Sequence, residues 1–283
     1  MADQPDNPTR TTGRDDLFHD AAPAAFRFDA AVAAVFPDMI SRSVPGYRFN
    51  LELVAAVARR HVQPRTRVYD LGCSLGAMTL SIRTALSTLP RPPEDVELLG
   101  VDSSAAMIER ARTQLDAFHS PYRTRLTCAD LQAVSVENAS LVVLGYTLQF
   151  IPAEERDAVL ERIRAGLVPG GVLLLAEKVH EPDAEAERLM TELHHDFKRA
   201  NGYSELEIAH KRQALENVLR TETVDAHEER LRRAGFDHVV MLSRHYGFCL
   251  WLARCGENAT PATSESGEKV ASREPSGPAA DRP

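Results

Sequence analysis

Three aspartates stand at the ends of short apolar segments: Asp70 in RVYDLG, Asp102 in VELLGVD and Asp130 in TRLTCAD. If these segments are neighbouring parallel strands, their carboxyl ends meet at one edge of a sheet, where α/β folds bind ligands. Asp102 is then placed to accept hydrogen bonds from both ribose hydroxyls, and Asp130 from an adenine amino group. Taken singly, Asp102 is also explained as a cap of the following helix and Asp130 as a turn residue. Together they predict a site for an adenosyl ligand.

The turn after the first of these strands carries Gly72, Ser74 and Gly76 directly before a predicted helix. Glycines recur in such turns because the backbone passes close to a ligand that side chains would obstruct. The turn is not a GxxxxGK[ST] phosphate loop and no lysine follows it, so a nucleoside triphosphate is not expected. Asp70 suits the amino-acid end of S-adenosylmethionine, whereas a dinucleotide would place its pyrophosphate at the helix start. The turn therefore favours S-adenosylmethionine.

The elements that must position these residues follow an alternating pattern. Short apolar runs separated by helical stretches extend from Arg67 to Glu177, and they end in SLVVLGY and GVLLLAE. This alternation predicts a parallel sheet with helices on both faces. A Pro-Gly-Gly turn is expected before the fifth strand, and HVVMLSRHYGF with CLWLAR predicts a terminal hairpin. The fold class is therefore α/β, a Rossmann-like class I methyltransferase fold with a mostly parallel seven-stranded sheet.

Flanking segments divide the chain further. FRFDAAVAAVFPDMISRSVPGY predicts a helix and a turn that cover the front of the fold, and a second helix is expected from Tyr47 to about His61. Helical periodicity without strands predicts an insertion over about residues 180–222. We expect one domain over residues 26–255. The polar extension 1–25 and the tail 256–283 are too poor in apolar residues to order themselves.

Composition limits the function. Asp and Glu number 41 against 33 Lys and Arg, a net charge of -8, which disfavours direct nucleic-acid binding. No apolar run is long enough to cross a membrane, and no signal peptide is evident. The scattered cysteines form no zinc or disulfide pattern and suit a reducing cytoplasm: Cys73, Cys128, Cys249 and Cys255.

The insertion carries charged and titratable residues. His194 and His195 lack a third ligand at helical spacing, so they are expected at a surface or interface and no metal is assigned. The basic residues are expected to form a solvated face, although one arginine could instead reach an anion. These basic residues are Lys198, Arg199, Lys211 and Arg212, and their expected partners are Glu205, Glu207 and Glu216. Tyr47 either packs on the core or reaches the cofactor pocket with its hydroxyl.

Longer motifs resemble one family. VFPDMISRSVPGY, VYDLGCSLGAMTLSIR, VDSSAAMIERAR, TLQFIP and HHDFKRANGYSELEIAHKRQALENVL are similar to segments of the carboxy-S-adenosyl-L-methionine synthases. The similarity runs from about Phe28 to Arg254, and the insertion motif is peculiar to that family.

The resemblance implies an unusual carboxyl transfer. Such enzymes convert S-adenosylmethionine and prephenate to carboxy-S-adenosylmethionine and phenylpyruvate. In the proposed mechanism, prephenate loses carbon dioxide and hydroxide, the sulfonium methyl loses a proton, and the resulting ylide captures the carbon dioxide. A partner enzyme, a tRNA carboxymethyltransferase, then uses the product at wobble uridine 34. The chain itself need not hold the tRNA.

The resemblance also implies a set of site residues. Arg212, from the KR pair of the insertion, would bind the new carboxylate, because a guanidinium stays charged and can bind it bidentately. In the family this arginine reaches across from the neighbouring subunit, so a homodimer is implied. The remaining contacts carried over by motif are Tyr47, Gly72, Cys73, Ser74, Asp102, Ser103, Asp130 and Leu131, with Asp70 as argued above.

Two positions depart from the family pattern. Gly145, in VVLGYTLQF, stands where the family usually has a cofactor-binding asparagine. Loss of that amide is expected to cost about 1 kcal/mol of binding if water replaces it. Ser103, where an asparagine can also stand, keeps a donor and an acceptor.

Two other functions compete with carboxyl transfer. An ordinary methyltransferase acting on a small molecule would have almost the same cofactor site, but Arg212 would repel its positively charged methyl group. A non-enzymatic module that stores or presents the nucleoside would retain its ligand without turning over prephenate.

Overall fold

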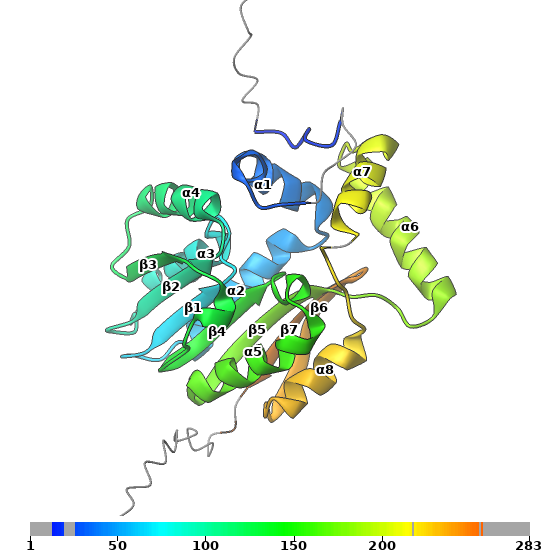
Figure 1. The fold of residues 1–283 in the computed structure, drawn as a ribbon. Helices are drawn as coiled ribbons and strands as arrows, with labels where there is room; N and C mark the ends of the chain where they lie inside the picture. The colour runs from blue at the N-terminus through cyan, green and yellow to red at the C-terminus, as the bar shows by residue number, and fades with distance from the viewer. Residues whose placement is uncertain (1–12, 20–25, 217, 255, 257–283) are drawn as a thin grey trace, which may run out of the picture.

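The computed structural model describes residues 13–19, 26–216, 218–254 and 256. Seven strands form one sheet in the order β3-β2-β1-β4-β5-β7-β6 (Figure 1). The strands are β1 (Arg67–Leu71), β2 (Glu97–Asp102), β3 (Arg123–Cys128), β4 (Ala139–Gly145), β5 (Leu167–Lys178), β6 (His238–His245) and β7 (Phe248–Arg254). The first five pair in parallel, while β7 runs antiparallel to both β5 and β6. The predicted sheet and terminal hairpin are confirmed.

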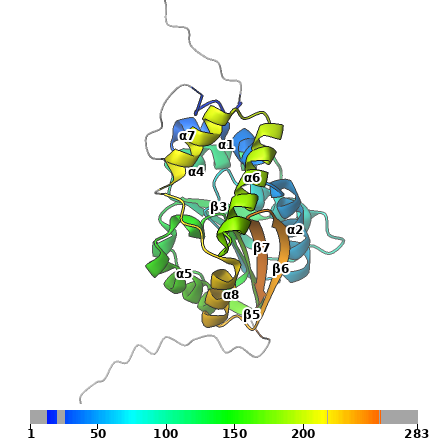
Figure 2. The ribbon, with the colours of Figure 1, turned by 90° about the vertical axis from the view of Figure 1, so that its right-hand side faces the viewer.

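Helices cover both faces of this sheet. On one face α2 (Tyr47–His61) and α3 (Ala77–Ser87) bury apolar side chains, among them Val54 and Ile82, against the strands. On the other face α5 (Ala153–Gly166) and α8 (Val224–Arg233) do the same with Leu160 and Leu231. Figure 2 shows the two sets on opposite sides of the sheet. Because both faces are buried, β4 carries a continuous apolar run, Leu141–Leu144, instead of alternating apolar and polar residues.

Three further helices form a cap beyond the carboxyl ends of the parallel strands (Figures 1 and 2). They are α1 (Ala30–Ser43), α6 (Ala184–Ala200) and α7 (Glu205–Leu215), and α4 (Ala105–Asp116) packs beside α1. Each cap helix begins at a side chain that accepts a backbone hydrogen bond: Asp29 for α1, Asp183 for α6 and Ser204 for α7. The last forms a capping box with Glu207. The cap thus combines the predicted N-terminal cover with the predicted insertion.

The helix predicted from Tyr47 to His61 has those bounds, because Gly46 at φ 74° supplies a left-handed turn before it. The Pro-Gly-Gly turn expected before the fifth strand is instead an irregularity inside β5. Ala139 pairs with Leu167 and Leu141 with Val172, so the intervening residues bulge from the ladder.

The prediction that residues 1–25 do not order is wrong for residues 13–19. Asp15 is 1% exposed and Phe18 6% exposed. The Asp15 amide donates to Asp38 at 2.7 Å, and the backbone oxygen of Asp15 accepts from Arg42 at 2.8 Å. Polar contacts with the cap thus compensate for the segment's low apolar content. The predicted tail lies outside the described residues, apart from Gly256.

None of the helices in the described part of the chain combines the length and apolarity needed to cross a bilayer.

Candidate functional site

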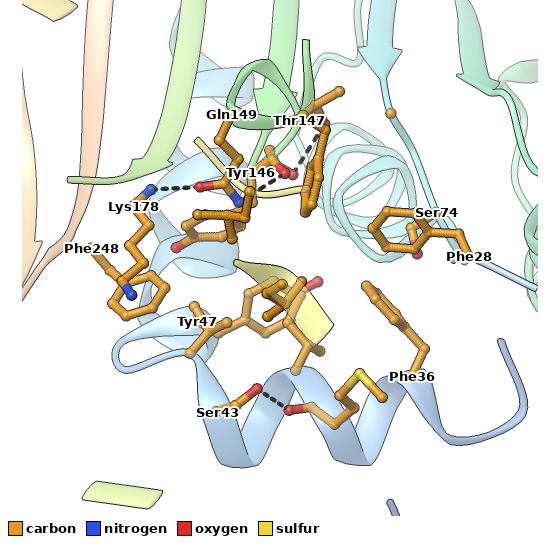
Figure 3. A pocket seen from close by; sticks show the side chains of 18 of the residues that line it. Phe28, Phe36, Ser43, Tyr47, Ser74, Tyr146, Thr147, Gln149, Lys178 and Phe248 are labelled. Carbon is orange, nitrogen blue, oxygen red and sulfur yellow. Dashed lines mark hydrogen bonds between the residues drawn. The ribbon is translucent and has the colours of Figure 1, made fainter. Parts of the chain in front are cut away.

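A cavity of about 860 Å³ lies between the carboxyl ends of the strands and the cap. Figure 3 shows Lys178 and Phe248 on one side of it, Phe28 and Phe36 on the other, and Tyr47 between them. All eleven residues predicted as site residues line this cavity: Tyr47, Asp70, Gly72, Cys73, Ser74, Asp102, Ser103, Asp130, Leu131, Gly145 and Arg212. They come from the carboxyl ends of β1, β2 and β4, from the turns after β1, β2 and β3, from α2 and from α7.

The turn after β1 is fixed by close backbone contacts. Gly72 has φ 80°, and a Cβ atom there would lie 2.1 Å from Oγ1 of Thr147. Its amide donates to the Val101 oxygen at 2.7 Å. Ser74, at φ 50°, occupies the left-handed region without being a glycine, and its amide donates to Asp102 at 2.9 Å. The glycine requirement at position 72 is therefore both conformational and steric.

Asp70 is a buried carboxylate on β1. Its Oδ2 accepts hydrogen bonds from the backbone amide of Thr79 at 3.0 Å and from the Thr79 hydroxyl at 2.6 Å. Burial raises the pKa of Asp70 to about 6, although these two hydrogen bonds oppose the rise. A cation beside Asp70 would recover part of the lost solvation of its charged form, so this end of the cavity suits an ammonium group.

Asp102 accepts hydrogen bonds from two backbone amides and is not the N-cap of the following helix. Its Oδ2 accepts from the Ser74 amide, and its Oδ1 accepts from the Ser104 amide at 2.9 Å. The N-cap of α4 is Ser104, whose hydroxyl accepts from the Met107 amide at 3.2 Å. These bonds orient the Asp102 carboxylate at the cavity wall, and each oxygen retains a lone pair. Burial raises the pKa of Asp102.

Asp130 lies two residues beyond β3 and is exposed at the cavity edge. It precedes the short 3-10 helix Leu131–Ala133, but its side chain makes no capping hydrogen bond there. Its carboxylate is thus not committed to capping that helix.

Tyr47 both packs and lines the cavity. Its ring lies 6.3 Å from that of Tyr146, and burial, followed by the charge of Asp70, raises the pKa of its hydroxyl. Tyr146 has φ 60° at the end of β4, and its hydroxyl accepts from the Asn50 amide at 2.8 Å. This buried bond helps hold a backbone conformation that is costly for an aromatic residue.

Gly145 faces Met78 of α3. A Cβ at position 145 would lie 2.5 Å from the Met78 sulfur and 2.6 Å from its methyl carbon. The thioether therefore fills the space that any larger side chain at position 145 would enter, and both residues line the cavity.

Sequence reasoning missed an aromatic wall. The Phe28 ring lies 5.0 Å from Phe26, 6.2 Å from Phe36 and 5.2 Å from Phe150, each in an edge-to-face arrangement. The hydroxyl of Ser104 donates to the Phe28 backbone oxygen at 2.5 Å, which ties this segment to the turn after β2. The signal in the sequence is the alternating FRF before the first helix.

Two of the insertion's basic residues do not form the predicted solvated face. Arg199 does pair with Asp196 and Glu205 at the surface. Lys198 and Lys211, however, are 8% and 5% exposed and line the cavity. The amphipathic period of α6 turns Lys198 inward, which composition alone does not reveal.

Arg212 borders the cavity of its own chain although its side chain is exposed. Within the described residues, its guanidinium has no hydrogen bond or ion pair. His194 Nε2 lies 2.9 Å from the Ser43 oxygen, and burial lowers the pKa of His194 to about 3, so its ring is neutral. Among the described residues, no three His, Cys, Asp or Glu side chains gather as a metal site would require.

Comparisons with known proteins fit this geometry. A family model described as a methyltransferase domain matches residues 69–173. The carboxy-S-adenosyl-L-methionine synthase of Hahella chejuensis is 46% identical over 85% of this chain and 98% of its own length. The synthase of Klebsiella pneumoniae is 47% identical over 87% and 99%. That of Salmonella paratyphi B is 49% identical over 83% and 94%.

Solved structures show the fold alone. An O-methyltransferase family protein from Burkholderia thailandensis matches with a TM-score of 0.58 at 15% identity, over 88% of this chain and 69% of that one. Human N-acetylserotonin methyltransferase, solved with S-adenosylmethionine, matches with a TM-score of 0.53 at 19% identity, over 80% and 55%. The class I methyltransferase fold is thereby confirmed.

The close approach at Gly72 generates a prediction. Gly72→Ala adds a methyl group against Thr147 in a left-handed conformation, so it should lower the free energy of unfolding by about 3 kcal/mol. Gly170→Ala is the matched control, because Gly170 has φ 74° but its nearest neighbour to a Cβ is 3.7 Å away. That control should cost only about 1 kcal/mol. Equal losses in urea denaturation would contradict the steric role of Gly72.

Proposed function

The chain belongs to the carboxy-S-adenosyl-L-methionine synthase family, and from this premise we propose that it converts S-adenosylmethionine and prephenate to carboxy-S-adenosylmethionine and phenylpyruvate. The observation that carries the proposal is one cavity with two opposed chemistries. Carboxylates lie at the strand ends, and cationic side chains come from the insertion. A methyltransferase needs only the carboxylates, because they attract its cationic cofactor, whereas cationic side chains would repel the methyl group.

The cavity residues fit S-adenosylmethionine as a substrate. Asp70, buried and deprived of solvent, suits the ammonium group of its methionine end. Asp102, oriented by two backbone amides, suits the ribose hydroxyls, and Asp130 suits the adenine amino group. The aromatic wall around Phe28 adds apolar surface for a base.

The overall reaction balances without an added oxidant. A carbon–carbon bond of prephenate breaks to release carbon dioxide, and the electron pair left on the ring expels hydroxide by breaking the ring carbon–oxygen bond, which yields phenylpyruvate. The hydroxide takes one proton from the sulfonium methyl group, and that carbon forms a new bond to the carbon dioxide. Water, phenylpyruvate and carboxy-S-adenosylmethionine are the products. The site must keep bulk water away from these intermediates, which the cap helices and the ordered segment 13–19 favour.

Arg212 is proposed to bind the new carboxylate. Its guanidinium borders the cavity and has no anionic partner among the described residues, so it is available for a bidentate contact. A homodimer in which a second subunit completes this site is also proposed. It is supported by exposed apolar residues on the same helices, namely Leu189 of α6 at 50% and Leu206 of α7 at 55%.

The product is proposed to pass to a tRNA carboxymethyltransferase that modifies wobble uridine 34. The net charge of -8 agrees with a chain that supplies this product without holding the tRNA. A cytoplasmic location is proposed as well, since the described cysteines, Cys73, Cys128 and Cys249, are free thiols.

Incubation with both substrates tests the function. The purified protein with S-adenosylmethionine and prephenate should form a cofactor species heavier by one carbon dioxide, together with phenylpyruvate, as detected by mass spectrometry. Omission of prephenate is the control. Formation of S-adenosylhomocysteine with a methylated acceptor would instead indicate a methyltransferase. Retained nucleoside without any turnover would indicate a binding module.

The raised pKa of Asp70 predicts a pH dependence. If the Asp70 carboxylate must be charged to bind the ligand's ammonium group, affinity for S-adenosylmethionine should strengthen as pH rises through about 6. The gain should be up to about tenfold per pH unit below that value. Asp70→Asn should weaken binding at pH 7 and remove the slope, as measured by calorimetry between pH 5 and 7.

Asp70→Asn should weaken ligand binding but raise the stability of the ligand-free protein. The folded state binds the Asp70 proton more tightly than the unfolded chain, so this group lowers stability as pH rises from 3.8 to about 6. The ligand-free Asp70→Asn protein should therefore be more stable at pH 7, by about 3 kcal/mol. A destabilised variant with unchanged affinity would contradict the assigned role.

A further inference from the structure

Lysine is rare in this chain, and its positions are informative. Only four of the 33 Lys and Arg residues are lysines: Lys178, Lys198, Lys211 and Lys269. Lys269 lies outside the described residues, and the other three all line the one cavity. Where the chain needs a positive charge elsewhere it almost always has arginine. At three positions of the cavity wall the chain therefore has lysine, with its compact ammonium group, in place of the arginine that it uses almost everywhere else.

Lys211 already has a structural partner. Its Nζ lies 3.3 Å from Asp15 Oδ2, 3.3 Å from the Ser43 hydroxyl and 3.4 Å from the Tyr203 hydroxyl. The Asp15 carboxylate is 1% exposed, and it also accepts a hydrogen bond from Tyr203. Lys211 thus anchors the ordered N-terminal segment to the cap, and its charge is neutralised within the chain.

Lys198 has no such partner. Its side chain on α6 is more than nine-tenths buried and lines the cavity, yet no hydrogen bond or ion pair of its ammonium group is found within the described residues. Burial, followed by the charges of Lys211 and Lys178, lowers the pKa of Lys198 to about 7, and Asp15 opposes the shift. A buried ammonium group without an anion is costly, so the position is suited to a negatively charged ligand.

Lys178 belongs to the same group of charges. It ends β5, where its backbone amide donates to Gln149 Oε1 at 3.1 Å, and Figure 3 shows its side chain directed away from Gln149 toward Phe248, beside the cavity. Burial lowers the pKa of Lys178, as does the charge of Arg212, whereas Glu187 of α6 raises it. Glu187 also accepts from the Glu181 amide at 2.8 Å, so it is already engaged at the start of α6. The two lysines and Arg212 leave this end of the cavity with an excess of positive charge.

We propose that Lys178 and Lys198 form a carboxylate subsite, distinct from Arg212, for the acid group that the second substrate keeps throughout the reaction. The inference rests on the proposed function and adds the group that positions its co-substrate. The carboxyl group that is transferred leaves as neutral carbon dioxide, and a lysine pair cannot hold it through that step. A dicarboxylate substrate is retained only if its other carboxylate is bound, and that carboxylate remains on the keto-acid product.

Replacement of each lysine tests the subsite. Lys198→Met and Lys178→Met keep the unbranched apolar stem of the side chain and remove the ammonium group. Each should raise the KM for prephenate by about 10- to 100-fold, the effect of losing a charge-assisted hydrogen bond. Because S-adenosylmethionine binds at the strand ends, its dissociation constant should change less than about twofold. Competitive inhibition by phenylpyruvate should weaken in parallel with the KM effect, since that product carries the retained carboxylate.

Arg199→Met is the matched control. Arg199 follows Lys198 on α6, but it pairs with Asp196 and Glu205 at the surface, so its loss should leave both constants unchanged. Melting temperatures of all three variants show whether any of them fails to fold.

The outcomes distinguish failure of the lysine subsite alone from failure of the proposed function. If the wild type forms carboxy-S-adenosylmethionine but both lysine variants keep the wild-type KM and phenylpyruvate inhibition, the subsite is wrong and the proposed function stands. If the folded wild type neither turns over prephenate nor binds phenylpyruvate when loaded with S-adenosylmethionine, the proposed function and the subsite both fail.

Discussion

Like charges enclosed in one cavity are the constraint on which this structure depends. Lys178, Lys198 and Arg212 lie together, and none has an ion pair within the described residues. Such an arrangement is unfavourable in the absence of a ligand, because burial removes the solvation of the two lysines and neighbouring cations repel. A substrate with carboxylates compensates for the lost solvation and reduces the repulsion between the cations. The binding energy is therefore concentrated on anionic ligands, as a reaction that moves a carboxyl group requires.

The opposite end of the cavity has the complementary charge. Asp70 and Asp102 are held by backbone amides from the start of α3 and from the turns after β1 and β2, so their positions follow from the sheet itself. The cap supplies Lys198 and Arg212, the end of β5 supplies Lys178, and the ends of β1 and β2 supply the anions. One cavity can thereby orient a cationic nucleoside and an anionic partner toward each other, since each is attracted to only one end.

Closure of the cavity by the cap depends on residues 13–19, which are far in sequence from the insertion helices that they contact. Asp15 bonds to Lys211 and Tyr203 of the insertion and to Arg42 of α1, and His210 Nδ1 lies 2.9 Å from the Phe18 oxygen. The sequence predicted the sheet, the α2 bounds and the gathering of three aspartates at one edge of the sheet correctly, because alternating apolar runs and turn residues are local signals. It did not predict the packing of residues 13–19, the bulge in β5 or the inward lysines. The first two arise from contacts between distant segments, which periodicity does not encode, and the inward lysines depend on which helix face packs toward the cavity.

The number of protons exchanged on binding tests the central claim most directly. Calorimetric titration of the S-adenosylmethionine-loaded protein with phenylpyruvate is carried out about one pH unit above the Lys198 pKa of about 7, in buffers of different ionisation enthalpy. An arriving carboxylate stabilises the charged ammonium group, so binding should take up a proton, approaching one per cavity, and Lys198→Met should abolish the uptake. Tight binding without proton uptake, or uptake that persists in Lys198→Met, would contradict the account.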